Sequence, residues 1–370
     1  MLHGEQFARQ RLIDGWDQHA LAAATVIVAG VGALGNEVAK NLALAGVGRL
    51  ILCDPDVVET TNLNRTVLFT PGDLGRPKVA AAAAAIARLG SGTRTEPRQA
   101  TLTAGVGLGE LADASAVLGC LDSRKARLEL LGRCALADAL LVDGGTGPWS
   151  GEVRIRRSAA EACYACTLSA FDRGETDLPR SCAEAQPPGA EPASIATSAL
   201  TASWMTVILL RLLLRQPVSF GMLRIDAETG TTAPVAAVRD PSCCHHQPLP
   251  PADGVLPVRH RDPVSALFSA LPEGSEPTTW SVFPVVAPCL HCGHETGYDN
   301  GRSTDPPTPL RCERCGAIQR LRSSNRLADA GRDDRLADLG VAPQEILPVR
   351  TREGNYLWLR LGAGSSSASA

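Results

Sequence analysis

Apolar and polar residues in the first half of the chain follow the order expected of strands separated by helices. Four short, largely apolar runs predict buried strands, at residues 25–29, 49–53, 115–120 and 139–144. Apolar residues at helical spacing predict three helices, at residues 36–48, 78–89 and 123–137. Because strand and helix alternate, the pattern predicts an α/β protein with a Rossmann-like, doubly wound and mainly parallel sheet.

The pattern becomes less regular further along. Residues 172–194 are polar and rich in proline, which predicts a crossover loop. A helix is expected at 195–215 and closing strands at 222–238, and "QPLPPADGVLP" (247–257) has the composition of a linker. The tail has short strand candidates and a final "GSSSASA" that we expect to be disordered; the candidates are 345–350 and 355–362.

Composition excludes some classes of function. Apolar residues make up 44% of the 370 residues, and the net charge of -3 gives no electrostatic reason to expect nucleic acid or an anionic membrane. The most apolar run, at 204–215, is short and interrupted by Arg211, which favours a buried helix over a membrane span. The N-terminal residues are polar and do not look like a signal peptide, so we expect a cytoplasmic protein.

A glycine-rich turn marks a candidate nucleotide site. The motif "GVGALG" places Gly30, Gly32 and Gly35 between a predicted strand and a predicted helix. Glycines allow a tight turn and close backbone approach, and the helix N-terminus offers free N–H groups to phosphate. Asp54 follows the second strand, where it would accept hydrogen bonds from ribose hydroxyls.

Further polar residues point beyond simple dinucleotide binding. Arg65 and Lys78 follow soon after Asp54, and Asp122 follows the third strand. A hydride-transfer enzyme would leave these three residues without a role. Phosphoryl or nucleotidyl transfer needs cations aimed at phosphate oxygens and a carboxylate that holds Mg²⁺.

Cysteine pairs predict metal sites, because twelve cysteines in a cytoplasmic chain favour metal or thiol chemistry over disulfides. Cys163 and Cys166 have the spacing of two zinc thiolates. Four more cysteines form a CxxC-x₁₉-CxxC pattern that predicts a zinc ribbon: Cys289, Cys292, Cys312 and Cys315. This segment has few apolar residues, so metal binding would supply much of its folding energy.

Together, these motifs resemble the family of ThiF, MoeB and the ubiquitin-activating enzymes. The matching stretches, within residues 5–246, are "GVGALG", "AGVGRLILCDPDVVETTNLNR", "GRPKVAAA" and "CLDSRKAR", with "FARQRLI" near the N-terminus. The resemblance implies an ATP-binding adenylation domain at 1–246. A linker at 247–280, the zinc ribbon at 281–325 and a short β-containing tail at 326–370 would follow.

The resemblance also implies roles for individual residues. Asn62 and Arg65 would contact the nucleotide phosphates with Lys78 beside them, and Asp122 would help to hold Mg²⁺. Arg9 would reach into the site of a partner subunit, which implies a homodimer, although it could be an ordinary surface residue. Asp56 is grouped with the nucleotide-binding residues, and its alternative role is to order the loop.

Two further cysteine-based features follow from the resemblance. The family completes the Cys163–Cys166 site near the end of the domain, where Cys243 and His246 would give a Cys₃His site. Cys244 or His245 could substitute, or the site could hold no metal. Cys182, next to Arg180 in the crossover loop, could take the activated carrier as a thioester, because a nearby cation favours the thiolate. Its alternative is an incidental loop cysteine.

The resemblance implies ATP-dependent activation of the C-terminal glycine of a ubiquitin-like or sulfur-carrier protein. No rhodanese-like motif is visible, which favours conjugation over sulfur transfer, and the zinc ribbon suggests docking of a partner such as a conjugating enzyme. Three alternatives stay open. The first is adenylation of another carboxylate, such as a peptide or a modified tRNA nucleoside. The others are an NAD-dependent oxidoreductase and a non-enzymatic zinc-ribbon adapter.

Overall fold

The computed structural model describes residues 5–169, 194–294 and 311–363. The chain divides into two compact units. The first unit draws its residues from Met1–Leu102 and Leu111–Leu249, and the second from Thr103–Glu110 and Pro250–Ala370.

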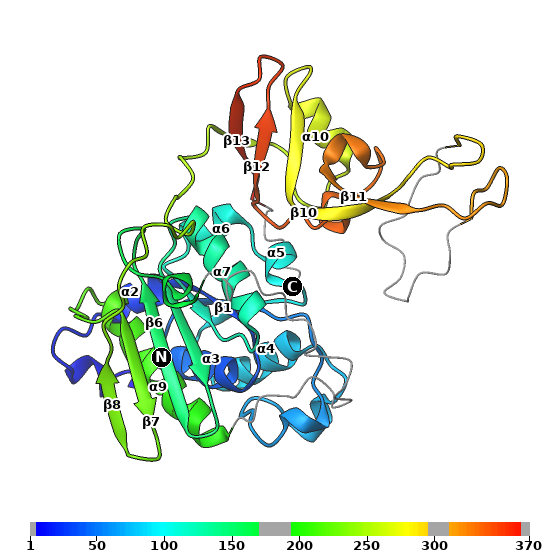
Figure 1. The fold of residues 1–370 in the computed structure, drawn as a ribbon. Helices are drawn as coiled ribbons and strands as arrows, with labels where there is room; N and C mark the ends of the chain where they lie inside the picture. The colour runs from blue at the N-terminus through cyan, green and yellow to red at the C-terminus, as the bar shows by residue number, and fades with distance from the viewer. Residues whose placement is uncertain (1–4, 170–193, 295–310, 364–370) are drawn as a thin grey trace. The chain divides into compact units, whose positions relative to one another are not determined.

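One large sheet organises the first unit (Figure 1). Its described strands follow the order β3-β2-β1-β4-β5-β6-β7-β8. Neighbours from β3 to β5 pair in parallel, whereas β5 to β8 pair antiparallel. The predicted α/β fold with a largely parallel sheet is therefore confirmed. The strands are β1 (Thr25–Ala29), β2 (Arg49–Cys53), β3 (Arg94–Arg98), β4 (Ala116–Gly119), β5 (Leu141–Thr146), β6 (Ser150–Arg156), β7 (Met222–Asp226) and β8 (Thr231–Pro234).

Helices cover both faces of this sheet. A Cβ at Gly144 of β5 would meet Leu34 and Met205, whereas one at the next residue, Gly145, would meet Arg127. Because successive strand residues point to opposite faces, α3 and α9 lie on one face and α7 lies on the other. The helices of this unit are α2 (Gln18–Ala23), α3 (Ala33–Ala45), α4 (Lys78–Arg88), α7 (Arg124–Leu136) and α9 (Ile195–Leu213).

Helix α9 is the one helix in the described ranges that is long and apolar enough to span a membrane. It packs against α3, β5 and β6, and Ala202, Met205 and Leu209 are fully buried in the core. This is the buried helix that the sequence predicts, and a core helix satisfies the same length and composition test.

Two parts of the first unit differ from, or fall outside, the sequence expectations. Strand β3 has the sequence "RTEPR", and it is half-exposed at the edge of the sheet. Because this sequence is mostly polar, it gives no signal for a buried strand. The crossover loop predicted at 172–194 lies almost entirely outside the described residues.

The second unit contains a sheet in the order β11-β10-β12-β13-β9. The range 247–280, expected to be a linker, contains β9, α10 and the start of β10. These elements are too short to show a clear apolar period, and their core residues come from distant segments. The elements are α5 (Leu102–Gly105), β9 (Gly254–Leu256), α10 (Val264–Ala270), β10 (Glu276–Val286), β11 (Leu321–Arg326), β12 (Ile346–Arg350) and β13 (Tyr356–Leu361); α6 (Leu108–Asp113) begins in this unit.

Two segments of the second unit repeat the same local structure. The backbone nitrogen of Val264 donates to the carbonyl of Asp334, and that of Leu336 donates to the carbonyl of Asp262. Each aspartate side chain also accepts a hydrogen bond from the backbone three residues earlier. A helical turn follows each aspartate, and then a strand, β10 or β12. The reciprocal hydrogen bonds join these two segments, which lie about seventy residues apart in the sequence, into one local arrangement.

The turn between β1 and α3 positions the candidate nucleotide site through close backbone contacts. A Cβ at Gly35 would lie 2.0 Å from the carbonyl oxygen of Gly30. One at Gly30, which has a φ of +87°, would lie 2.4 Å from the carbonyl oxygen of Cys120. Gly32 has nothing within 4 Å of its ideal Cβ. Gly30 and Gly35 therefore serve packing, and Gly32 leaves the start of α3 open.

We expect Gly35→Ala to destabilise the first unit, because its methyl group must displace backbone atoms. Overpacking of this kind costs about 1–3 kcal/mol, which thermal unfolding would detect as a lower melting temperature. Gly32→Ala is the matched control: its methyl group meets no atom within 4 Å, so it should lose only the N-cap preference for glycine over alanine, about 1 kcal/mol. Equal stability of Gly35→Ala and the wild type would contradict the close contact.

Candidate nucleotide and metal sites

Asp54 joins the glycine-rich turn to the end of β2. Its Oδ2 accepts a hydrogen bond from the backbone nitrogen of Val31 at 2.7 Å, and its Oδ1 accepts one from the backbone nitrogen of Asp56 at 2.9 Å. The residue is 5% exposed. Burial raises its pKa, although both hydrogen bonds and the charge of Lys78 oppose that shift. The carboxylate thus orders the turn, and the ribose contact stays a prediction.

Lys78 lies at the same edge of the sheet. Its Nζ is 2.8 Å from Oδ2 of Asp56, and the lysine side chain is 12% exposed. The backbone nitrogen of Lys78 also donates to the Asp56 carbonyl, and the backbone nitrogen of Val58 donates to the carbonyl of Arg76. These contacts bring Lys78 beside Asp54 and Asp56. The ion pair supports the view that Asp56 orders this loop.

Asn62 and Arg65 lie in the loop that starts with the short helix η2 (Thr60–Asn62). The Asn62 Oδ1 accepts a hydrogen bond from the Glu59 backbone nitrogen at 3.0 Å, and the Arg65 guanidinium donates to the carbonyl of Thr61. Both side chains are half-buried. Their partners lie within the loop, and no interaction among the described residues joins Arg65 to Lys78.

Asn36 is a site residue that sequence reasoning missed. Its Nδ2 donates to the carbonyls of Val31 and Gly32, at 2.7 and 3.1 Å, and its Oδ1 accepts from the backbone nitrogen of Leu68 at 3.0 Å. The side chain is fully buried. It therefore fixes the segment after Arg65 to the glycine-rich turn. The available signal was a polar residue at an inward position of an otherwise apolar helix face.

The remaining predicted catalytic residues occupy separate positions. Asp122 is exposed in the turn between β4 and α7. Arg9 is exposed and immediately precedes the short helix η1 (Gln10–Leu12). Cys182 lies outside the described residues, so its role stays a prediction.

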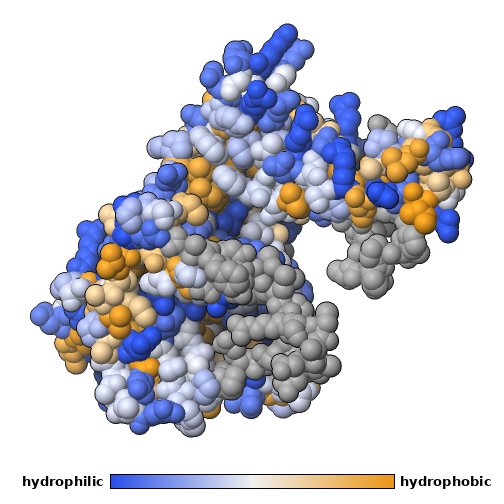
Figure 2. Space-filling view, in the orientation of Figure 1, coloured by the Kyte–Doolittle hydropathy of each residue, from blue (hydrophilic) through white to orange (hydrophobic). Residues whose placement is uncertain are grey.

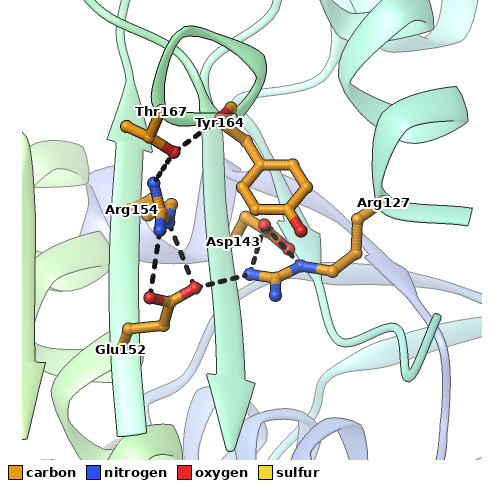
Figure 3. Close-up of polar contacts among 6 residues, drawn as sticks. All are labelled: Arg127, Asp143, Glu152, Arg154, Tyr164 and Thr167. Atoms are coloured by element: carbon orange, nitrogen blue, oxygen red, sulfur yellow. Dashed lines mark hydrogen bonds and ion pairs between the residues drawn. The ribbon is translucent and has the colours of Figure 1, made fainter. Parts of the chain in front are cut away.

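Figure 3 shows a group of six side chains, which we call the arginine–tyrosine cluster. Its Asp143 pairs in register with Gly119, the last residue of β4. The cluster joins α7, β5, β6 and the short helix η4 (Tyr164–Thr167). Sequence reasoning missed it, although charged residues alternate along β6 and an aspartate interrupts the apolar β5. The members are Arg127, Asp143, Glu152, Arg154, Tyr164 and Thr167.

Ion pairs hold the arginine–tyrosine cluster together. The Arg127 guanidinium donates to Oδ2 of Asp143, from Nε at 3.0 Å and from Nη2 at 2.8 Å, and also reaches Glu152 at 3.4 Å. Arg154 donates to both oxygens of Glu152 at 3.1 Å. Burial raises the pKa of Asp143. Burial would also raise the pKa of Glu152, but the two arginines lower it overall.

Four potential metal ligands meet in the first unit, and we call them the first metal cluster: Cys163, Cys166, Cys243 and His246. The Cys163 Sγ lies 3.6 Å from that of Cys166 and 3.7 Å from that of Cys243. Tetrahedral zinc with Zn–S bonds of about 2.3 Å places sulfur atoms about 3.8 Å apart. The arrangement therefore fits zinc.

The ring of His246 is oriented for this role. Its Nε2 lies 3.1 Å from Cys166 Sγ, and its Nδ1 lies 2.9 Å from the carbonyl oxygen of Ala159. A carbonyl partner at Nδ1 fixes the tautomer that leaves Nε2 free to bind metal, as is common for histidine ligands. Cys244 is exposed and is not part of the cluster. The structure thus brings together the four residues chosen from the sequence.

The second unit holds the second metal cluster: Cys289, Cys292, Cys312 and Cys315. The two CxxC turns have matching backbone hydrogen bonds, in which Gly293 donates to Cys289 and Gly316 donates to Cys312 at 2.8 Å. Backbone N–H groups lower the pKa of Cys289 to about 6, which favours the thiolate that metals bind. Exposed apolar residues lie close to the ligands in the sequence: Leu290 lies inside the first CxxC turn, and Ile318 follows Cys315 by three residues. Figure 2 shows hydrophobic residues, drawn in orange, on the surface of the molecule.

The sheet, the glycine-rich turn and the two cysteine clusters define a doubly wound α/β protein with two potential metal centres. The ThiF family model matches residues 4–245, and the chain belongs to the ThiF family. The resemblance inferred from the sequence is therefore confirmed.

Similar proteins include several adenylyltransferases. The chain is 38% identical to the Adenylyltransferase and sulfurtransferase MOCS3 of Bos taurus over 43% of this chain and 35% of that protein. It is 35% identical to the Molybdopterin-synthase adenylyltransferase of Salmonella typhimurium, over 49% of this chain and 72% of that protein. It is 32% identical to the Sulfur carrier protein ThiS adenylyltransferase of Escherichia coli, over 44% of this chain and 66% of that protein. The chain thus matches about a third of the length of bovine MOCS3.

The fold is also similar to that of a solved enzyme. The structure of E. coli MccB with ATP aligns with a TM-score of 0.53 and 18% identity, over 66% of this chain and 74% of that chain. At this identity the likeness concerns the fold alone.

We expect Cys166→Ser to lower the metal content by one equivalent per chain, because it removes a ligand from the first metal cluster. Cys244→Ser is the matched control and should leave the metal content unchanged, since the Cys244 thiol is exposed and outside the cluster. Elemental analysis of the purified full-length proteins measures both. Loss of metal in Cys244→Ser with retention in Cys166→Ser would reverse the ligand assignment.

Proposed function

We propose that this protein adenylates the C-terminal carboxylate of a ubiquitin-like or sulfur-carrier protein at the expense of ATP. The observation that carries the proposal is the joining of Asp54, Asp56 and Lys78 to an open glycine-rich turn. Membership of the ThiF family and the adenylyltransferase names of its relatives support it.

The reaction needs negative charge to be stabilised around the α-phosphate. An oxygen of the carrier carboxylate attacks the α-phosphorus, pyrophosphate leaves, and an acyl-adenylate forms. Lys78 and Arg65 would stabilise the phosphate oxygens, with Asn62 beside them, and the start of α3 would offer backbone N–H groups. Asp122, which is exposed in the turn after β4, would hold Mg²⁺, which prefers oxygen ligands.

The finer parts of the proposal concern partners and later steps. We propose zinc at both metal clusters, a homodimer in which Arg9 serves the partner's site, and a cytoplasmic location. The exposed apolar residues of the second metal cluster support docking of a protein such as a conjugating enzyme. Cys182 would then capture the activated carrier as a thioester and release AMP.

We expect exchange of pyrophosphate into ATP only when a carrier ending in Gly-Gly is present. Arg65→Ala, Lys78→Ala and Asp122→Ala should each lower the exchange rate by on the order of 10²-fold, the scale of losing one group that stabilises transition-state charge. Arg88→Ala, at the exposed end of the helix that begins with Lys78, is the matched control and should leave the rate unchanged.

The same assay separates the alternatives. A carrier that lacks its last glycine should not support exchange. Exchange with a peptide or a small carboxylate, and without a carrier, would favour adenylation of another substrate. Full partner function in Arg65→Ala and Asp122→Ala would favour a non-enzymatic adapter.

We expect a carrier adduct that is sensitive to a thiol reductant and lost in Cys182→Ala. Cys244→Ala is the control, because its exposed thiol should not be needed. Gel mobility of the full-length protein after incubation with ATP and carrier measures the adduct. An adduct that persists in Cys182→Ala places the nucleophile elsewhere.

A further inference from the structure

The arginine–tyrosine cluster contains Tyr164, which lies between Cys163 and Cys166 of the first metal cluster, and Arg127, which lies near the start of α7. We propose that Tyr164 is a positioning residue that transmits the state of the first metal cluster to Asp122. Metal at this cluster would thereby set the affinity of the site for Mg·ATP. The inference rests on the proposed function for the role of Asp122, and on contacts of the first unit for the link itself.

The first step of the link is the turn that carries Tyr164. Cys163 and Cys166 flank it, and the backbone nitrogen of Cys166 donates to the Cys163 carbonyl at 3.1 Å. The Thr167 hydroxyl donates to the carbonyl of Tyr164 at 2.8 Å. A metal bond at each cysteine would fix both ends of this short turn. Thiol hydrogen bonds are weak and would hold it less firmly.

The second step is the contact of the Tyr164 ring with two cations. The Arg127 guanidinium carbon lies 4.6 Å from the ring centroid, and that of Arg154 lies 5.1 Å from it. Arg154 also donates to the Thr167 hydroxyl at 2.6 Å. Figure 3 shows the ring between the two arginine side chains. A shift of the turn therefore removes the aromatic face from both guanidinium groups.

The third step runs from Arg127 to the first turns of α7. The backbone nitrogen of Arg127 donates to the Ser123 carbonyl at 3.1 Å, and its side chain is anchored on β5 through Asp143. The Oδ1 of Asp143 is buried without a hydrogen-bond partner among the described residues. Arg127 therefore neutralises the charge of this buried carboxylate. Moving Arg127 away would leave that charge unpaired, which favours one fixed geometry for the pair.

The last step is the position of Asp122. It directly precedes Ser123, the N-cap of α7, whose Oγ accepts a hydrogen bond from the Ala126 backbone nitrogen at 3.2 Å. Any change in the first turn of α7 is therefore passed to Asp122 through the backbone. The path ends in the exposed turn that carries Asp122, and before that turn it runs through α7, which contacts both η4 and β5.

The test compares Tyr164→Leu with Tyr164→Phe in the full-length, metal-loaded protein. Tyr164→Leu removes the aromatic face but keeps the metal ligands. It should weaken Mg·ATP binding, measured by calorimetry, by on the order of tenfold, the scale of a partly buried cation–π contact. It should also speed release of zinc from the first metal cluster to a chromogenic chelator. Tyr164→Phe should restore wild-type values for both quantities.

Internal controls make the outcome specific. Release of zinc from the second metal cluster should not change in Tyr164→Leu. Tyr356→Leu, which removes an exposed tyrosine of the second unit, should change neither quantity. Thermal unfolding verifies that each variant is folded.

A double-mutant cycle tests whether the first metal cluster and Tyr164 act on Mg·ATP binding through the same link. His246→Ala, which removes a ligand of the first metal cluster, should weaken Mg·ATP binding in the wild-type background. It should have little further effect in the Tyr164→Leu background, because the link is already broken. Additive effects, or wild-type Mg·ATP affinity and zinc release in Tyr164→Leu, would overturn the inference. Absence of carrier-dependent exchange in the wild type refutes the proposed function, while calorimetry and zinc release still decide the link.

Discussion

One buried amide, the side chain of Asn36, holds the edge of the sheet where the candidate nucleotide site lies. It satisfies two carbonyl groups of the glycine-rich turn and one backbone N–H of the segment after Arg65. Each of these groups would cost about 1–3 kcal/mol if left buried and unpaired. The turn and the loop therefore adopt one arrangement together, and the polar stretch from Asp54 to Arg65 depends on that arrangement.

The parts of the fold that the sequence predicts are those with local signals. Strands β1 and β2 are short apolar runs beside a glycine-rich turn, and the three CxxC spacings predict metal ligands without tertiary information. Asn36 and the Arg127–Asp143 pair escaped prediction because their meaning lies in contacts between distant segments. The pairing of the two segments around Asp262 and Asp334 escaped for the same reason, because it consists of backbone hydrogen bonds between distant segments.

The predicted site residues fall into two groups, those that contact another segment and those that bond within their own loop. Asp54, Asp56 and Lys78 are joined because their segments run side by side, and the ion pair explains why the loop carries a second aspartate. Asn62 and Arg65 bond within their own loop, so their predicted phosphate contacts require an exchange of partners when a nucleotide binds. Such an exchange costs little for half-exposed side chains, because water can replace the contacts that they give up.

The two flanks of the candidate site are built from different kinds of interaction. On the side of Arg65, a neutral amide fixes the backbone and carries no charge that could respond to a ligand. On the side of Asp122, the helix start is held by buried charges, Arg127 with Asp143, and by an aromatic ring fixed between two cysteines. A charged network in a partly buried setting depends strongly on its geometry, because a displaced partner leaves an uncompensated charge. This asymmetry is the reason that we propose the Asp122 side as the one through which metal binding would act on nucleotide binding.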